Sequence, residues 1–379
     1  MVCKLWFSIC LLVVALGLVA TGCGSKGPAS GPDQPSGSRP DSSAPTSASA
    51  VLPTTPGDDV YTPVGNVGEE LRLAADSADI SALVAAAVNE ARPLPIDPIF
   101  AIYQSSRNLR GTGQIRSLRA FARSDAPAQT FPEAAQFFGN AGFLDEAVTD
   151  AITASGSATG YTTLQQQPAV QQAVQRILYY MSLQQLRAAL PRAQARATDP
   201  EAGAPHNVDA AWAIYVGLPD SGTHSRPLAA VARRLETRFH REGAIDRPLR
   251  EALQRAQRAA MNRDLSELAE AQRVAESRFN AIYYLTTAQL LDDAMQAAQS
   301  GDANQAVVSQ AEGLHAYMTI QPLVARADSA ADQSIVRYFR ADPIALTPTT
   351  RDITLNALNR TLSALGLTDQ DRLTRADLR

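Results

Sequence analysis

The sequence predicts an all-α protein. Ala, Gln, Arg, Leu and Glu dominate the chain after about residue 58, and these residue types favour helices. Apolar residues recur at steps of three and four, which is the spacing of one helix face, whereas the alternation typical of strands is almost absent. We therefore expect an all-helical domain over residues 58–379, folded as a helical bundle.

Prolines and glycines mark the expected helix ends in the first part of this domain. Pro132 fits the first turn of a helix, where its missing N–H costs no hydrogen bond. Gly139 and Gly156 each follow a helical stretch, as C-terminal glycines commonly do. The helices expected here cover residues 69–75, 80–91, 99 onward, 115–123, 132–138 and 144–154.

Longer amphipathic stretches follow. Pro168 is expected to open a long helix, Gly217 to end a short one, and Thr350 to cap a last helix that Gly366 closes. Glu–Arg pairs at helical spacing support the stretches in between. The helices expected here cover residues 168–190, 208–216, 227–240, 248–262, 265–298, 303–320 and 323–339.

A helix pair recurs along the chain. Tyr179 and Tyr283 lie 104 positions apart, and Leu186 and Leu290 repeat that offset. A constant offset across a long helix and the short one after it predicts an internally duplicated helix pair, at about residues 168–219 and 265–323. Convergence between Ala-rich helices is the alternative interpretation.

The N-terminal residues have the pattern of an export signal. Lys4 precedes an apolar run from Leu5 to Val19, and the small residues before Cys23 resemble a bacterial lipobox. We expect a signal peptide at residues 1–22 and lipidation of Cys23, whose acyl chains would hold the protein on a membrane. A plain transmembrane anchor, or secretion after cleavage nearby, are the alternatives.

The composition of the chain indicates a tether after the signal peptide and excludes several kinds of site. Residues 23–57 are rich in Ser, Pro and Gly and predict a disordered tether. Of the 3 cysteines, Cys3 and Cys10 fall in the signal peptide, so the exported domain has no thiol for a disulfide or a metal. The net charge of −4 argues against a nucleic-acid-binding surface.

Acidic and aromatic residues around two short helices could bind a metal. His206 and Asp209 form H-x-x-D where one short helix begins. Glu312 and His315 form E-x-x-H on one face of the other, a spacing that helical iron proteins use. Fe(III) accepts carboxylate, imidazole and phenolate ligands together, and the preceding helices supply phenols at Tyr179, Tyr180, Tyr283 and Tyr284.

Structural roles are the alternative for each candidate. Asp209 would be favoured in a first turn by the helix dipole, with Asn207 as the N-cap. His206 would then be a loop histidine, and the tyrosines would be core residues with bonded hydroxyls. Trp212 is assigned to packing beside the site. The chain has no nucleophile elbow, P-loop, Rossmann glycine pattern or H-E-x-x-H, so no enzyme is predicted.

Several segments in the same order resemble a known family, the Fe-assimilating, low-iron-inducible periplasmic proteins of green algae, with homologues in dinoflagellates and bacteria. The strongest is Asp209-x-Ala-Trp-Ala-Ile-Tyr-Val-Gly217, and similar order extends over about residues 71–339. The other segments are 99–108, 116–119, 137–145 and 311–323. The resemblance implies an extracytoplasmic protein that assists iron uptake without being the membrane transporter.

Imelysin-like lipoproteins of iron uptake are a second comparison, but their Gly-x-His-x-x-Glu order does not occur here. The sequence therefore predicts a lipid-anchored iron-binding protein of the cell envelope, in the bacterial periplasm or at the cell surface. Its expected partners are the membrane, through Cys23, and an iron permease or another envelope protein. The alternatives are an envelope interaction protein without a metal and a helical di-iron oxidase, which needs further inward-facing carboxylates.

Overall fold

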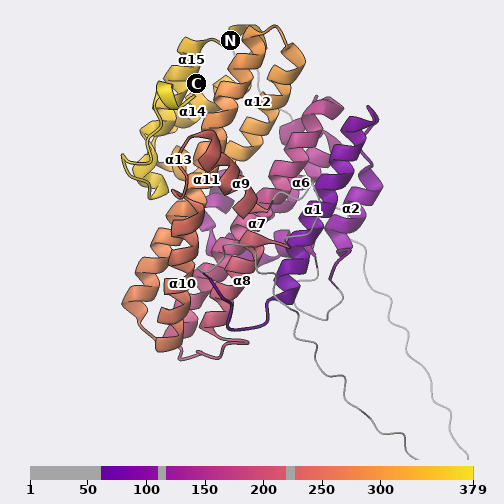
Figure 1. Cartoon of the computed structure of the whole chain (residues 1–379). Helices are drawn as coiled ribbons and strands as arrows, with labels where there is room; N and C mark the ends of the chain where they lie inside the picture. Colours follow the sequence, from indigo (N-terminus) through magenta and orange to yellow (C-terminus); the bar gives the residue numbers. More distant parts are fainter. Residues whose placement is uncertain (1–60, 110–116, 219–226, 379) are drawn as a thin grey trace, which may run out of the picture. The chain divides into compact units, whose positions relative to one another are not determined.

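The computed structural model describes residues 61–109, 117–218 and 227–378, and all regular secondary structure in these ranges is helical (Figure 1). The all-α prediction is confirmed. The predicted signal peptide, Cys23 and tether lie outside the described residues, as does most of the loop before the helix expected at 115–123. Among the helices that are described, none combines the length and the apolar character needed to cross a membrane.

Fifteen α-helices and four short 3₁₀ helices make up the described part of the chain. They are α1 (Gly68–Asn89), α2 (Ile96–Ser105), α3 (Leu118–Ala122), α4 (Asp125–Thr130), α5 (Pro132–Phe138), α6 (Phe143–Thr153), η1 (Gly156–Ala158), α7 (Thr163–Gln194), α8 (Ala204–Val216), α9 (Leu228–Arg238), α10 (Asp246–Asn262), α11 (Leu265–Gln299), α12 (Ala303–Tyr317), α13 (Gln321–Ala327), α14 (Ser329–Phe339), η2 (Pro343–Ala345), α15 (Pro348–Asn359), η3 (Leu362–Leu365) and η4 (Arg375–Leu378).

Two long helices, α7 and α11, form the centre of the bundle, and each packs along the short helix that follows it, α8 or α12. The predicted long–short pairs are therefore both present. Helix α10 joins them by packing on α8 and α11, while α12 packs on α7. Both long helices bury side chains around much of their circumference, polar ones among them, because other helices pack on several of their sides. Ile177, Leu186, Phe279 and Leu291 are among their fully buried side chains.

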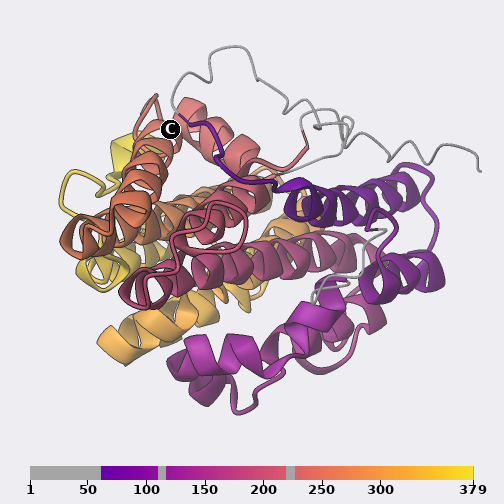
Figure 2. The same ribbon diagram turned by 90° about the horizontal axis from the view of Figure 1, so that it is seen from below.

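The remaining helices cover this centre from two directions. Figure 2 shows the indigo and magenta N-terminal helices beside α7, and the yellow C-terminal helices beside α11. Among the N-terminal helices, α1 and α6 make the most extensive contacts with α7, and among the C-terminal ones α15 does so with α11. The first helices and α8 thereby enclose the region where the candidate site lies.

Some predicted boundaries are wrong because tertiary contacts outweigh local signals. The helices expected at 69–75 and 80–91 are one helix, α1. Buried Asp76 continues it because its carboxylate accepts hydrogen bonds from the backbone N–H of Arg107 and from the backbone and side chain of Asn108. Pro168 lies inside α7, which begins earlier through a capping box of Thr162 and Gln165.

Other predicted helix boundaries are wrong because a different residue caps the helix. Helix α8 begins at Ala204, so Asn207 lies inside the helix and is not its N-cap. The stretch expected as one helix at 323–339 is divided at Asp328, whose side chain accepts from the N–H of Ala331 and caps α14. Thr347, not Thr350, caps α15, which ends at Asn359 well before Gly366. The short helix α4 was not predicted.

Candidate functional site

Asp209 is the most completely hydrogen-bonded of the predicted ligands. Its Oδ1 accepts from the Tyr61 hydroxyl at 2.5 Å and from the Gln257 amide at 2.6 Å. Its Oδ2 accepts from the backbone N–H of Val64 and of Gly65, both at 2.9 Å. The carboxylate is fully buried. These four bonds fasten residues 61–65 onto α8 and leave neither oxygen without a donor.

Trp212 packs on the same segment. Its ring stacks on the ring of Tyr61 with 5.1 Å between centroids and 16° between planes. The indole is 5% exposed. Trp212 and Asp209 therefore hold Tyr61 from two sides, one by stacking on its ring and the other by accepting a hydrogen bond from its hydroxyl.

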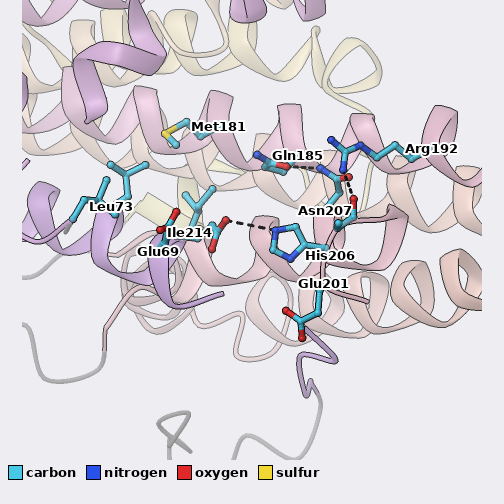
Figure 3. A pocket seen from close by; sticks show the side chains of 12 residues that line it. Glu69, Leu73, Met181, Gln185, Arg192, Glu201, His206, Asn207 and Ile214 are labelled. Carbon is cyan, nitrogen blue, oxygen red and sulfur yellow. Dashed lines mark hydrogen bonds and ion pairs between the residues drawn. The ribbon is translucent and has the colours of Figure 1, made fainter. Parts of the chain in front are cut away.

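His206, one turn before Asp209 on α8, faces a cavity instead. The cavity has a volume of about 410 Å³ and lies between the start of α1, the second half of α7 and the start of α8 (Figure 3). His206 Nε2 lies 3.8 Å from Glu70 Oε1, the contact drawn as the dashed line at His206. The side chains that line the cavity are Glu69, Glu70, Leu73, Leu109, Met181, Gln185, Arg192, Glu201, Ala202, His206, Asn207 and Ile214. We call this space the α1–α8 pocket.

The α1–α8 pocket is acidic. It contains three carboxylates, Glu69, Glu70 and Glu201, against one guanidinium, Arg192, which donates to the carbonyl of Ala202 at 2.6 Å. Burial raises the pKa of the Glu70 carboxyl; the neighbouring Glu69 adds to the rise, and the charge of a protonated His206 opposes it. A cation entering the pocket would relieve this crowding of negative charge.

Polar atoms without a partner also border the pocket. The Asn207 amide donates to Gln185 Oε1 at 2.5 Å, but its own Oδ1 is buried without a donor among the described residues. His206 Nδ1 is buried and equally without a partner there. Carboxylate, imidazole and amide oxygen are all ligands that iron accepts. As the side chains stand, no group of three or more His, Cys, Asp or Glu in the described part is arranged to hold a metal ion.

The second predicted pair, Glu312 and His315, lies in the interface of α12 with α7. The Gln172 amide donates to Glu312 Oε1 at 3.1 Å, and Arg176 Nη2 donates to the carbonyl of His315 at 3.0 Å. His315 is fully buried, and neither ring nitrogen has a partner in the described structure. Burial and the charges of Arg176 and Arg340 lower the pKa of His315 to about 3, so its imidazole is neutral.

The four predicted tyrosine ligands are core residues. Tyr179 packs edge-to-face on Tyr180 and on Tyr283, with centroids 5.1 and 5.2 Å apart. The Tyr179 hydroxyl donates to Asn280, and that of Tyr284 to Asn359, 2.6 Å in both cases. Burial raises the pKa of all four phenols, that of Tyr284 to about 12. Such phenols resist the ionisation that iron ligation requires.

The structure thus distributes the predicted ligands over separate places. His206 lies in the α1–α8 pocket, Asp209 anchors residues 61–65, and Glu312 and His315 lie between α7 and α12. The sequence analysis missed the three carboxylates that line the pocket with His206. Glu69 and Glu70 read as ordinary first-turn acids, and Glu201 lies in the loop before α8. The one signal available in the sequence was the pair of adjacent acids in the first turn of α1.

Comparison with known proteins gives one match. The family model described as low iron-inducible periplasmic protein matches residues 43–331, which is most of the chain and includes every residue that lines the α1–α8 pocket. No curated protein and no solved structure is detectably similar to this chain.

Proposed function

Because the chain belongs to the low iron-inducible periplasmic protein family, we propose that it binds iron outside the cytoplasm and assists its acquisition, with the α1–α8 pocket as the site. The family describes a periplasmic protein made under low iron, and a protein that captures the scarce ion fits that condition. Iron is cargo in this proposal, and the protein is a binding protein without an enzymatic step.

The observation that carries the proposal is the Glu70–His206 pair inside an acidic cavity. A carboxylate and an imidazole 3.8 Å apart can take up a metal between them after small side-chain movements. Glu69 is exposed and lines the same cavity, so its carboxylate is free to turn toward it. Glu201 is exposed as well and would give up its hydrogen bond from the Asn66 N–H to do so. The remaining positions around iron would be filled by water or by a small acid that arrives with the ion, for which about 410 Å³ leaves room.

The alternative iron site at Glu312 and His315 is less favourable. Arg176 is 1% exposed, bonds the His315 carbonyl and has no carboxylate partner among the residues described. A cation between α7 and α12 would be repelled by this guanidinium in a low-dielectric interior. The α1–α8 pocket has the opposite charge balance.

Attachment to a membrane belongs to the same proposal. A lipid on Cys23 and a tether over residues 23–57 would let the helical domain capture iron at a distance from the membrane surface. An iron permease or another envelope protein would then receive the ion.

Iron titration of the full chain tests the site. We expect wild-type protein to bind about one iron, and the double variant E70Q/H206Q to bind it at least about 100-fold more weakly, because two direct ligands are lost. The matched control H240Q/E242Q changes one exposed histidine and one exposed glutamate elsewhere, and should bind as the wild type does. The measurement is calorimetric titration with Fe(II) and Fe(III), with metal content after desalting.

Two results would contradict the proposal. Undiminished binding by E70Q/H206Q would place iron elsewhere, and E312Q/H315Q would then show whether the α7–α12 interface holds it. A wild-type protein that binds neither oxidation state would leave an envelope interaction protein without a metal. Helical content measured by circular dichroism should be equal in all variants.

A further inference from the structure

We propose that a second pocket, on the other short helix, binds a small organic carboxylate. This pocket has a volume of about 400 Å³ and is bounded by η1, the start of α7, α12 and the end of α14. We call it the α12 pocket. The residues that carry the argument are Ser157, Tyr161, Gln165, Leu314, Phe339 and Arg340. The proposal does not depend on iron binding at the α1–α8 pocket.

Arg340 is the one charged side chain that lines the α12 pocket. Its guanidinium makes no ion pair or side-chain hydrogen bond with the described residues, so its donors are free for a ligand. A guanidinium matches the planar carboxylate group with two parallel hydrogen bonds. The charge of Arg340 and the absence of any acidic side chain from the lining make this pocket suited to an anion.

Neutral donors lie in the same lining. The Tyr161 hydroxyl has no hydrogen-bond partner within the described ranges. Gln165 uses its Oε1 to accept from the Thr162 backbone and hydroxyl in the capping box, which leaves its amide N–H groups available. The pocket therefore offers hydrogen-bond donors from three side chains: Tyr161 and Gln165 near the start of α7, and Arg340 at the end of α14.

The other wall of the pocket is apolar and closely packed. Val307, Leu314 and Phe339 contribute it. Gly313 permits this packing, because a Cβ there would lie only 2.1 Å from Cε1 of Phe339. An arginine facing an apolar wall favours a carboxylate on a carbon skeleton over inorganic phosphate, which has no apolar part to bury.

A neutral imidazole and a second guanidinium lie buried behind the pocket. The His315 ring lies edge-on to Tyr161, 5.8 Å between centroids, and both its nitrogens lack partners among described residues. Behind it is Arg176, buried and bonded to the His315 carbonyl. Burial lowers the pKa of His315, and the positive charges of Arg176 and Arg340 lower it further.

The two pockets therefore differ in charge. The α1–α8 pocket contains three carboxylates, and the α12 pocket contains one arginine and no acid. The chain would hold a cation beside one short helix of the repeated pair and an organic anion beside the other.

Titration of the iron-free full chain with benzoate, succinate, citrate and inorganic phosphate tests the inference. We expect at least one of the carboxylates to bind with one site per chain, and the exposed-residue variant R340Q to weaken it at least about tenfold, because a charge-assisted bidentate contact is lost. R337Q is the matched control, since Arg337 is an exposed arginine on the same helix outside the pocket. It should leave the affinity unchanged.

Three results would overturn the inference. The first is that no carboxylate binds at concentrations up to about 10 mM, a weak limit for a specific site. The second is equal binding by wild type and R340Q. The third is that phosphate binds as tightly as any carboxylate, which would indicate a site for inorganic oxyanions. Because iron is absent throughout, failure here would leave the iron proposal untouched.

Discussion

Replacing Asp209 with alanine is expected to lower the free energy of unfolding by about 3–5 kcal/mol, because the Tyr61 hydroxyl and two backbone N–H groups lose their acceptor, while Gln257 keeps its bond to the Thr62 carbonyl. Tyr61, Gln257 and two backbone N–H groups all donate to this carboxylate. Residues 61–65 would detach from α8 or remain with unsatisfied donors. Denaturant unfolding measures the loss, and hydrogen exchange of Val64 and Gly65 should accelerate.

Controls separate this structural role from iron ligation. D369A removes a carboxylate that is 86% exposed and ion-paired only to Arg372, so it should change stability by less than about 1 kcal/mol. D209N keeps one acceptor oxygen and should be intermediate in stability while binding iron as the wild type does. Loss of iron by a stable D209N protein would instead restore Asp209 as a ligand.

Acidification is expected to destabilise the protein through His315. Its pKa is lowered to about 3 in the folded protein, against about 6.5 when unfolded. Below pH 6.5 the unfolded chain takes up a proton that the folded chain refuses, so stability falls as the pH drops from about 6.5 toward 3. By linkage, this one group costs roughly 3 kcal/mol at pH 4.5 relative to pH 7.5.

The measurement is the unfolding free energy at pH 7.5 and 4.5 for wild type, H315Q and H240Q. H315Q should lose about 3 kcal/mol less on acidification than wild type, whatever its stability at pH 7.5. H240Q, which removes an exposed histidine, should keep the full loss. An equal loss in H315Q and wild type would show that His315 is protonated in the folded protein.

Much of the fold follows from local pattern. Helix α5 begins and ends where the sequence predicts, because Pro132 and Gly139 are local signals for its two ends. The long helices α7 and α11 and the short helices α8 and α12 were also predicted from their apolar periodicity. Predicted helix boundaries are wrong where a tertiary contact determines them. Asp76 is an example, because the hydrogen bonds that it accepts from Asn108 keep α1 continuous.

The site was less accessible to prediction. His206 was identified from its motif, but its partner Glu70 lies far away in sequence and is brought near by the packing of α1 on α8. Asp209, three residues after His206, could be a metal ligand or a structural hydrogen-bond acceptor as far as the sequence shows. The hydrogen bond from Tyr61 in the structure identifies the structural role. Whether the four tyrosines are ligands or core residues depends on their burial. The spacing of residues along the sequence does not reveal burial of this kind.

Anomalous scattering at the iron absorption edge, from crystals of the iron-loaded full chain, would locate the ion directly. If iron binds between α1, α7 and α8, we expect one iron peak in the α1–α8 pocket, next to Glu70 and His206. A peak beside Glu312 and His315, or loaded crystals with no iron peak in the α1–α8 pocket, would contradict it.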